Sequence, residues 1–172
     1  MKSASSLKPH DVVLLLKILS KGPSGWRQVD IASDLEISQG EVAKSLARLR
    51  KSGFLAEKRV NRSALIEFLI HGLKYTFPAD IGALTVGVPT AISSPVFKNK
   101  IIQGDEDVYV WPSSKGDVRG QAVVPLYAKL ANVVLKDEQF YELLSLVEAL
   151  RVGRTRERKM AEEEIKKRIK SA

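Results

Sequence analysis

The side chains of this sequence best suited to recognising another molecule are cations and short polar groups gathered between Arg27 and Arg62. Lysine and arginine can neutralise the phosphates of a nucleic acid, while serine, glutamine and a bare glycine backbone can approach base edges closely. We predict that double-stranded DNA is contacted by Arg27, Ser38, Gln39, Gly40, Lys44, Ser45, Arg48, Lys51, Lys58, Arg59 and Arg62.

The chain contains few of the residue types that usually carry out catalysis. It holds 2 histidines and no cysteine, which excludes disulfides, thiolate metal sites and cysteine nucleophiles. No Ser-His-Asp set, metal cluster or phosphate-binding loop stands out, and a lone histidine such as His71 is more often packed or capping. The run Asp105-Glu106-Asp107 is typical of a solvated turn, because adjacent carboxylates diverge. We therefore expect no enzymatic activity, no cofactor and no bound metal.

Two predicted helices joined by a tight turn must position the candidate DNA contacts. The first helix covers Arg27 to Leu35, Glu36 and Ile37 form the turn, and Ser38 begins the second helix. Ser38 and Glu41 have the spacing of a capping box, with one hydrogen bond in each direction between side chain and backbone. One apolar face holds the pair together: Ala32, Leu35, Ile37, Val42, Leu46 and Leu49. The outer face of the second helix is then polar: Gln39, Gly40, Lys44, Ser45, Arg48 and Lys51.

A strongly apolar helix from His10 to Ser20 is predicted to complete a three-helix core. Its stripe is too wide for a lone surface helix, so we expect burial on several sides: Val12, Val13, Leu15, Leu16 and Leu19. The glycine and proline residues in 21–25 are predicted to end this helix. Trp26 is predicted to pack in the core rather than to lie on DNA. Gly53 is predicted to end the third helix as a C-cap residue.

The chain resembles winged-helix transcriptional regulators, the MarR-like and related bacterial groups, most closely at IASDLEISQGEVAKSLARLRKSGFL (31–55). The resemblance covers only the first third of the chain. It implies sequence-specific reading of double-stranded DNA by the helix that begins at Ser38, and a dimer on an inverted repeat. It also implies a β-hairpin wing after Leu55. Ala56 to Arg62 is too short for two strands and a turn, so we expect a reduced wing.

The rest of the chain predicts helices around an extended middle. Ser63 to Tyr75 has a helical apolar pattern, whereas Thr76 to Val124 is broken by proline and glycine, with VYVW (108–111) as its clearest strand. Asp137 is the predicted cap of an amphipathic helix, and a charged helix follows Gly153. The predicted fold class is mainly α, with a helix-turn-helix unit (7–62), a helix plus an extended segment with short strands (63–136), and C-terminal helices (137–172).

The net charge of +8 is concentrated at the two ends of the chain. Lysine and arginine outnumber acidic residues in 1–62 and in 151–172, whereas acidic residues prevail between these ranges. A polyanion would therefore be drawn to the ends. A basic cluster opens the last helix, which is typical either of a solvated helix end or of a second anion patch on DNA or a partner: Arg151, Arg154, Arg156 and Arg158.

The sequence thus predicts a DNA-binding transcriptional regulator. We expect a homodimer held by the apolar stripes of residues 12–19 and 140–150. In the alternative interpretation the helix-turn-helix is only a structural core, and a protein partner encoded alongside docks on the middle segment and basic tail. No run approaches the ~20 apolar residues of a membrane span, and the polar start lacks a signal peptide's apolar stretch. We expect a cytoplasmic protein without membrane contact.

Overall fold

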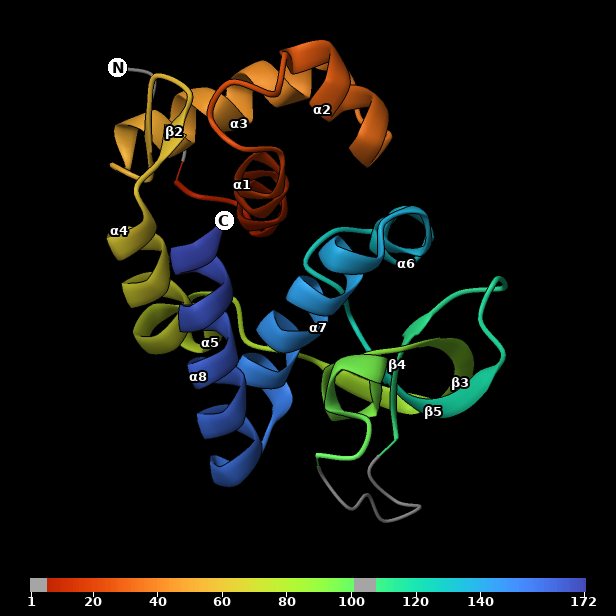
Figure 1. Ribbon diagram of the computed structural model, residues 1–172. Coiled ribbons are helices and arrows are strands. Elements are labelled where there is room, and N and C mark those ends of the chain that lie inside the picture. Colours follow the sequence, from red (N-terminus) through yellow and green to blue (C-terminus); the bar gives the residue numbers. More distant parts are fainter. Residues whose placement is uncertain (1–5, 101–107) are drawn as a thin grey trace.

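The computed structural model describes residues 6–100 and 108–172 and is mainly α-helical (Figure 1). The acidic run Asp105-Glu106-Asp107 lies outside the described residues. The chain begins with three helices, α1 (Pro9–Lys21), α2 (Gln28–Leu35) and α3 (Gln39–Lys51). None of the helices in the described ranges combines the length and apolar character that crossing a membrane would need.

The ends of α2 and α3 follow the local chemistry that the sequence predicts. Ser38 is the N-cap of α3, and its hydroxyl accepts a hydrogen bond from the Glu41 amide at 3.1 Å. Beyond α3, Gly53 has a φ of +78°, which a residue with a Cβ rarely adopts, and the Phe54 amide bonds the Leu49 carbonyl at 3.0 Å. The predicted start and stop of this helix are confirmed.

A small antiparallel hairpin follows α3, made of β1 (Leu55–Ala56) and β2 (Arg59–Val60). The prediction that this segment is too short for two strands and a turn is wrong. Two residues per strand suffice, because Glu57 turns the chain with a φ of +53° and Leu55 is buried in the core beneath the hairpin. Asn61 then caps the next helix, accepting a hydrogen bond from the Ala64 amide at 3.1 Å.

One continuous helical segment follows the hairpin, but it is not regular. It consists of α4 (Arg62–Glu67), a π-helical turn η1 (Phe68–Gly72) and α5 (Leu73–Thr76). Leu65, Leu69 and Leu73 are its fully buried residues. The predicted helix is therefore confirmed, and the π-turn within it is new.

The extended middle forms a three-stranded closed barrel. The long strand β3 (Ile81–Pro89) pairs antiparallel with both β4 (Tyr109–Pro112) and β5 (Val118–Val123), and β4 and β5 pair in parallel. Two short 3₁₀ turns, η2 (Ala91–Ser93) and η3 (Pro95–Phe97), follow β3. A Cβ on Gly87 would collide with the backbone of Trp111, so glycine permits the close strand approach.

The C-terminal part is α6 (Leu130–Val133), the 3₁₀ turn η4 (Val134–Lys136), α7 (Glu138–Val152) and α8 (Thr155–Ser171). The predicted cap is confirmed, because the Asp137 carboxylate accepts from the Phe140 amide at 3.1 Å. In Figure 1, α7 runs through the middle, with α8 along one side and the barrel on the other. The buried face of α8 is a thin apolar stripe: Ala161, Ile165 and Ile169.

The apolar stripes that suggested a homodimer are covered by the chain itself. All residues from Asp11 to Leu19 are buried, and α1 packs directly on α7. Every residue of α7 from Leu143 to Leu150 is buried as well. The predicted surfaces for dimerisation are therefore wrong, because one protomer already provides their apolar contacts.

Candidate nucleic-acid interface

The outward face of α3 combines cations with very small residues. Gln39, Gly40, Lys44 and Lys51 are exposed, as the sequence predicts. Ala43, Ala47 and Arg50 share this face, and sequence reasoning missed the arginine. Helical spacing could have found it, since position 50 lies one turn beyond Ala47. Small side chains let a partner approach the helix backbone, while the cations flank it.

Arg48 and Ser45 are not on this face, contrary to prediction. Arg48 is 6 % exposed and forms a two-pronged ion pair with the fully buried Asp11 of α1, with both N–O distances at 2.7 Å. Ser45 is fully buried and accepts a hydrogen bond from Arg48 at 3.0 Å. The signal in the sequence is Asp11 itself. A lone carboxylate in an apolar helix needs a buried cation.

A second ring of polar groups surrounds this ion pair. His10 Nε2 lies 2.9 Å from Glu41 Oε1 and 3.2 Å from the Arg48 guanidinium. The Glu41 carboxylate is thus used by His10 and Arg48, and of the predicted capping box the structure records the serine half. Burial alone would raise the pKa of Asp11, but hydrogen bonds from Arg48, Ser45 and the Lys8 amide leave that pKa lowered. The pair therefore stays charged and fixes α3 on α1.

The turn between α2 and α3 is held by the C-terminal half of the chain. Glu36 sits in the left-handed region with a φ of +53°. The Tyr127 hydroxyl donates to the Leu35 carbonyl at 2.5 Å, and the Lys129 ammonium donates to the Glu36 carbonyl at 2.8 Å. Lys136 pairs with the Glu36 carboxylate at 2.7 Å. Burial, with Glu36 nearby, raises the pKa of Tyr127 to about 12, so its hydroxyl keeps its proton.

The remaining candidates differ in how far they are already engaged. Trp26 is a buried core residue, as predicted, and exchanges hydrogen bonds with Lys58 at 3.3 and 3.1 Å. Arg59 is exposed on the hairpin. Arg62 turns toward the end of α8 and donates to the carbonyls of Lys170 and Ala172. Arg27 is exposed but pairs with Asp30 at 3.0 Å, which offsets its charge.

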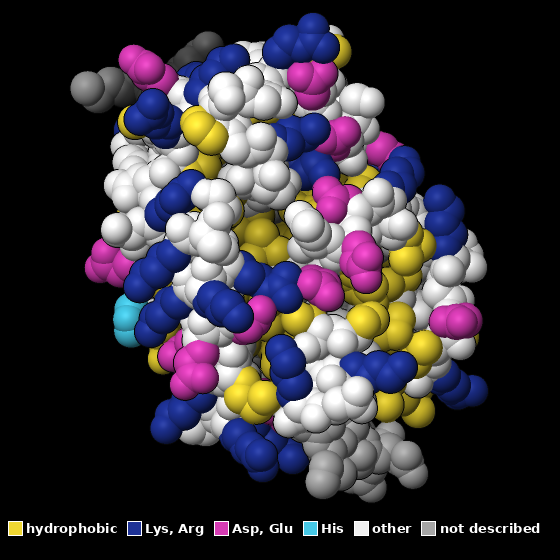
Figure 2. Space-filling view, in the orientation of Figure 1, with side chains coloured by type: hydrophobic (Ala, Val, Ile, Leu, Met, Phe, Trp, Pro, Cys, Tyr) yellow, Lys and Arg dark blue, Asp and Glu magenta, His cyan; other side chains and the backbone are white. Residues whose placement is uncertain are grey.

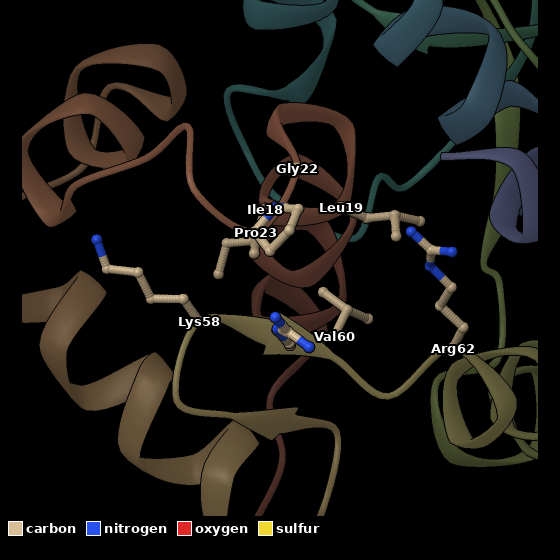
Figure 3. Close-up of a pocket in the computed structure, with 8 residues that line it drawn as sticks. Ile18, Leu19, Gly22, Pro23, Lys58, Val60 and Arg62 are labelled. Atoms are coloured by element: carbon tan, nitrogen blue, oxygen red, sulfur yellow. The ribbon is translucent and has the colours of Figure 1, made fainter.

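A cavity of about 260 Å³ lies between the end of α1 and the hairpin (Figure 3). Ile18, Leu19 and Val60 give it an apolar floor, and Lys58, Arg59 and Arg62 form a cationic rim. In Figure 3, Lys58 and Arg62 extend on opposite sides of Val60. Lys58 and Arg62 are therefore separated and do not form one cluster.

The basic start of α8 is divided by the structure. Arg154 and Arg156 are exposed and Arg158 is half-buried. The Arg151 side chain is 4 % exposed, pairs with Glu148 at 2.5 Å and donates to the carbonyls of Phe77, Pro78 and Val124. Its predicted role as an external anion contact is wrong, because it joins α7 to the chain just before β3 and just after β5.

Glu148 completes this second buried ion pair. It is 1 % exposed and also accepts from the Trp111 indole N–H at 2.8 Å. Burial raises the pKa of Glu148, although Arg151 and Trp111 oppose the shift. The sequence does carry a signal for this arrangement, namely an acid and an arginine three residues apart in the largely apolar second half of α7.

Comparison of the chain with protein-family models, with curated proteins and with solved structures finds no match. The functional reading therefore rests on the geometry of the chain's own residues.

Proposed function

We propose that this chain binds double-stranded DNA through the outward face of α3 and the β1–β2 hairpin, as a transcriptional regulator of the helix-turn-helix type. One observation carries the proposal. The described chain from Gln39 to Val60 exposes the cations Lys44, Arg50, Lys51, Lys58 and Arg59, and its exposed carboxylate is Glu57. Glu41, the other acid in this range, is occupied by Arg48 and His10. Such a surface attracts a polyanion.

The shape of α3 supports insertion into a groove. Gly40, Ala43 and Ala47 lie along the exposed face, so the helix can approach base edges without large side chains in between. Gln39 near its start can hydrogen-bond to bases, and Arg50 and Lys51 near its end can meet phosphates. The Asp11–Arg48 pair holds α3 at a fixed angle.

The proposal is tested by fluorescence anisotropy with duplexes selected from a random library, over a series of salt concentrations. We expect saturable binding whose affinity falls steeply with salt. Lys44→Ala and Arg50→Ala should weaken binding, whereas Arg119→Gln, an exposed arginine on the barrel, should not. Absence of binding to every duplex at about 50 mM salt would exclude this function.

Dimerisation on an inverted repeat remains part of this proposal, with a different surface. Several large apolar side chains are exposed on β3 and after β5: Ile81, Leu84, Val86 and Val124. Leu84, the most exposed of them at 61 %, is the position at which a charge would disturb pairing of two protomers. We expect Leu84→Asp to abolish a dimer detected by light scattering at tens of micromolar, roughly the range of a weak dimer.

The same exposed apolar face favours a second candidate function, a protein-interaction module in which α1, α2 and α3 serve as structural core. Exposed apolar side chains that gather on one part of a surface often mark such contacts. The two functions differ in the anisotropy experiment. A chain that binds no duplex even at low salt, and whose self-association is lost on Leu84→Asp, would fit the interaction module alone.

A further inference from the structure

A second cavity, remote from α3, opens between the start of α8 and the helical segment before the barrel. Its volume is about 300 Å³. The side chains around it that matter here come from η1, α5 and α8: His71, Lys74, Tyr75, Thr155, Arg158 and Lys159. Buried Leu150 forms part of the floor. Figure 2 shows lysine and arginine side chains gathered along the side of the molecule where α4 and α8 lie.

Arg158 is the unusual residue of this cavity. The arginines of the described chain that are buried or half-buried are Arg48, Arg151, Arg158 and Arg168. Three of them pair with carboxylates, namely Arg48 with Asp11, Arg151 with Glu148, and Arg168 with Glu142 and Glu164.

Within the described residues, no ion pair or side-chain hydrogen bond is recorded for Arg158, although Glu162 lines the same cavity. A half-buried arginine that lines a cavity with no recorded carboxylate partner in the described chain has guanidinium N–H donors available to an anion.

Most of the charged side chains around Arg158 are also positive. Lys74 and Lys159 add two further cations, and the His71 ring adds a polar group, against the single carboxylate of Glu162. Thr155 offers a hydroxyl at the first turn of α8, where the helix dipole also favours negative charge. This combination of guanidinium, ammonium and hydroxyl donors is that of a phosphate site.

Tyr75 indicates the shape of the rest of the ligand. It is 75 % exposed, and the Lys74 ammonium lies 4.8 Å from the centre of its ring. An exposed aromatic ring beside a cationic cavity can cover an aromatic or apolar group. His71 lies within the π-turn η1 and Lys74 directly follows it, and π-turns are rare and recur at functional sites.

The cavity is separate from the proposed DNA surface. Arg62, beside the hairpin, meets α8 at Lys170, whereas the cavity meets it at Arg158. With a rise of about 1.5 Å per residue, these two points lie roughly 18 Å apart along the helix. The cavity therefore lies toward the opposite end of α8 from the contact with Arg62.

We propose that this cavity binds the phosphate group of a small phosphate ester whose remaining part is aromatic or apolar. Arg158 and Lys74 hold the phosphate, and Tyr75 contacts the ring. Binding at this site does not depend on DNA binding by α3, and it is measured in the absence of DNA.

The test is a titration of the isotopically labelled full chain by NMR, with phenyl phosphate, inorganic phosphate and a short DNA duplex as separate probes. We expect phenyl phosphate to shift the amide signals of residues 71–75 and 155–162, and to bind more tightly than inorganic phosphate. Arg158→Gln and Lys74→Gln should each weaken phenyl phosphate about tenfold or more. The matched control is Arg156→Gln, an exposed arginine of the same helix that does not line the cavity.

Three results would overturn the proposal. The first is no shift at these amides with either phosphate probe. The second is an equal loss of affinity in Arg156→Gln, which would mean attraction by overall charge and not a site. In the third, the duplex shifts these amides while the small phosphates do not, and the cavity would then contact nucleic acid. Circular dichroism of each variant shows whether it folds. The proposal requires that Arg158→Gln on α8 and Lys74→Gln on α5 both weaken the binding of phenyl phosphate.

Discussion

The two buried ion pairs of this molecule look alike but do different work. Arg48 and Asp11 join two helices, and the pKa of Asp11 is lowered because hydrogen bonds to the charged carboxylate outweigh burial. Arg151 and Glu148 join a helix to the chain just before β3 and just after β5, and the pKa of Glu148 is raised because burial dominates. Hydrogen bonds therefore favour the charged form of Asp11, whereas burial works against the charged form of Glu148.

The largest expected effect is at Arg48. Its replacement by alanine leaves Asp11 buried without a partner, so Arg48→Ala should lower the free energy of unfolding by about 3–5 kcal/mol. The neighbouring exposed Arg50→Ala should change it by about 0.5 kcal/mol or less. Urea denaturation of both variants measures the difference. Equal small effects would show that the buried pair contributes nothing beyond a surface cation.

Neutral substitutions of the two carboxylates should lower the free energy of unfolding by different amounts. Asp11→Asn removes a charge that Arg48 needs and should cost about 2–3 kcal/mol near neutral pH. Glu148→Gln should cost less than about 1 kcal/mol, since the amide oxygen still accepts from Trp111 and Arg151 keeps three carbonyl acceptors. Urea denaturation at one pH ranks the two variants, and the reverse order would contradict the assignment.

On the outward face of α3, smaller effects are expected, and they concern binding instead of folding. Lys44→Ala and Arg50→Ala should weaken DNA binding by about 1–3 kcal/mol where the side chain reads a base. Where it meets a phosphate, the slope of log affinity against log salt should fall by about 1 instead. Anisotropy over several salt concentrations distinguishes these outcomes, and unchanged affinity and slope in the double variant would remove α3 from the interface.

The pH dependence of stability should differ in sign between the pairs. The folded pKa of Asp11 lies below its ordinary 3.8, so its contribution is present above that pH and is lost as pH falls through the folded pKa. The folded pKa of Glu148 lies above its ordinary 4.5, so its contribution is present below 4.5 and is lost as pH rises through the folded pKa. Urea midpoints from about pH 3 to 8 test this, with Asp11→Asn flattening the acid limb and Glu148→Gln the upper one.

The smallest effect is expected at the exposed start of α8. With Arg151 buried, only Arg154 and Arg156 of the three arginines remain on the surface there. Their joint replacement by glutamine should lower affinity for all DNA sequences about equally and leave the specificity ratio intact. Unchanged affinity for a non-specific duplex would show that this helix end does not take part in DNA binding.

Much of the local structure could be predicted because it depends on neighbours in the sequence. Ser38, Gly53 and Asp137 mark helix ends through their own backbone and side-chain chemistry, and the structure places those ends where predicted. The direction of Arg48 could not be found this way. It lies at the border between the two faces of α3, and what draws it inward is a carboxylate 37 residues away.

The same limit explains the failure at Arg151. Arg151 is basic and lies next to further cations, so its sequence context suggests a surface patch, but its carbonyl acceptors lie just before β3 and just after β5, far along the chain. The hairpin escaped prediction because its strands of two residues carry no alternating pattern. Contacts between distant segments decided the direction of both arginines, whereas the hairpin is local but too short to show a pattern.

Tyr127, Lys129 and Lys136 bond the turn at Glu36. These bonds decide whether the N-terminal helices can be produced as a separate fragment. The first 62 residues resemble a module that could be cut out and transplanted. Here α7 covers the back of α1, and residues 127–136 hold the turn in front of α3. An excised fragment 1–62 would uncover an apolar helix and lose three tethers at once, so it should aggregate. Hydrogen exchange should accordingly find α1 and α7 opening together, as a single cooperative unit.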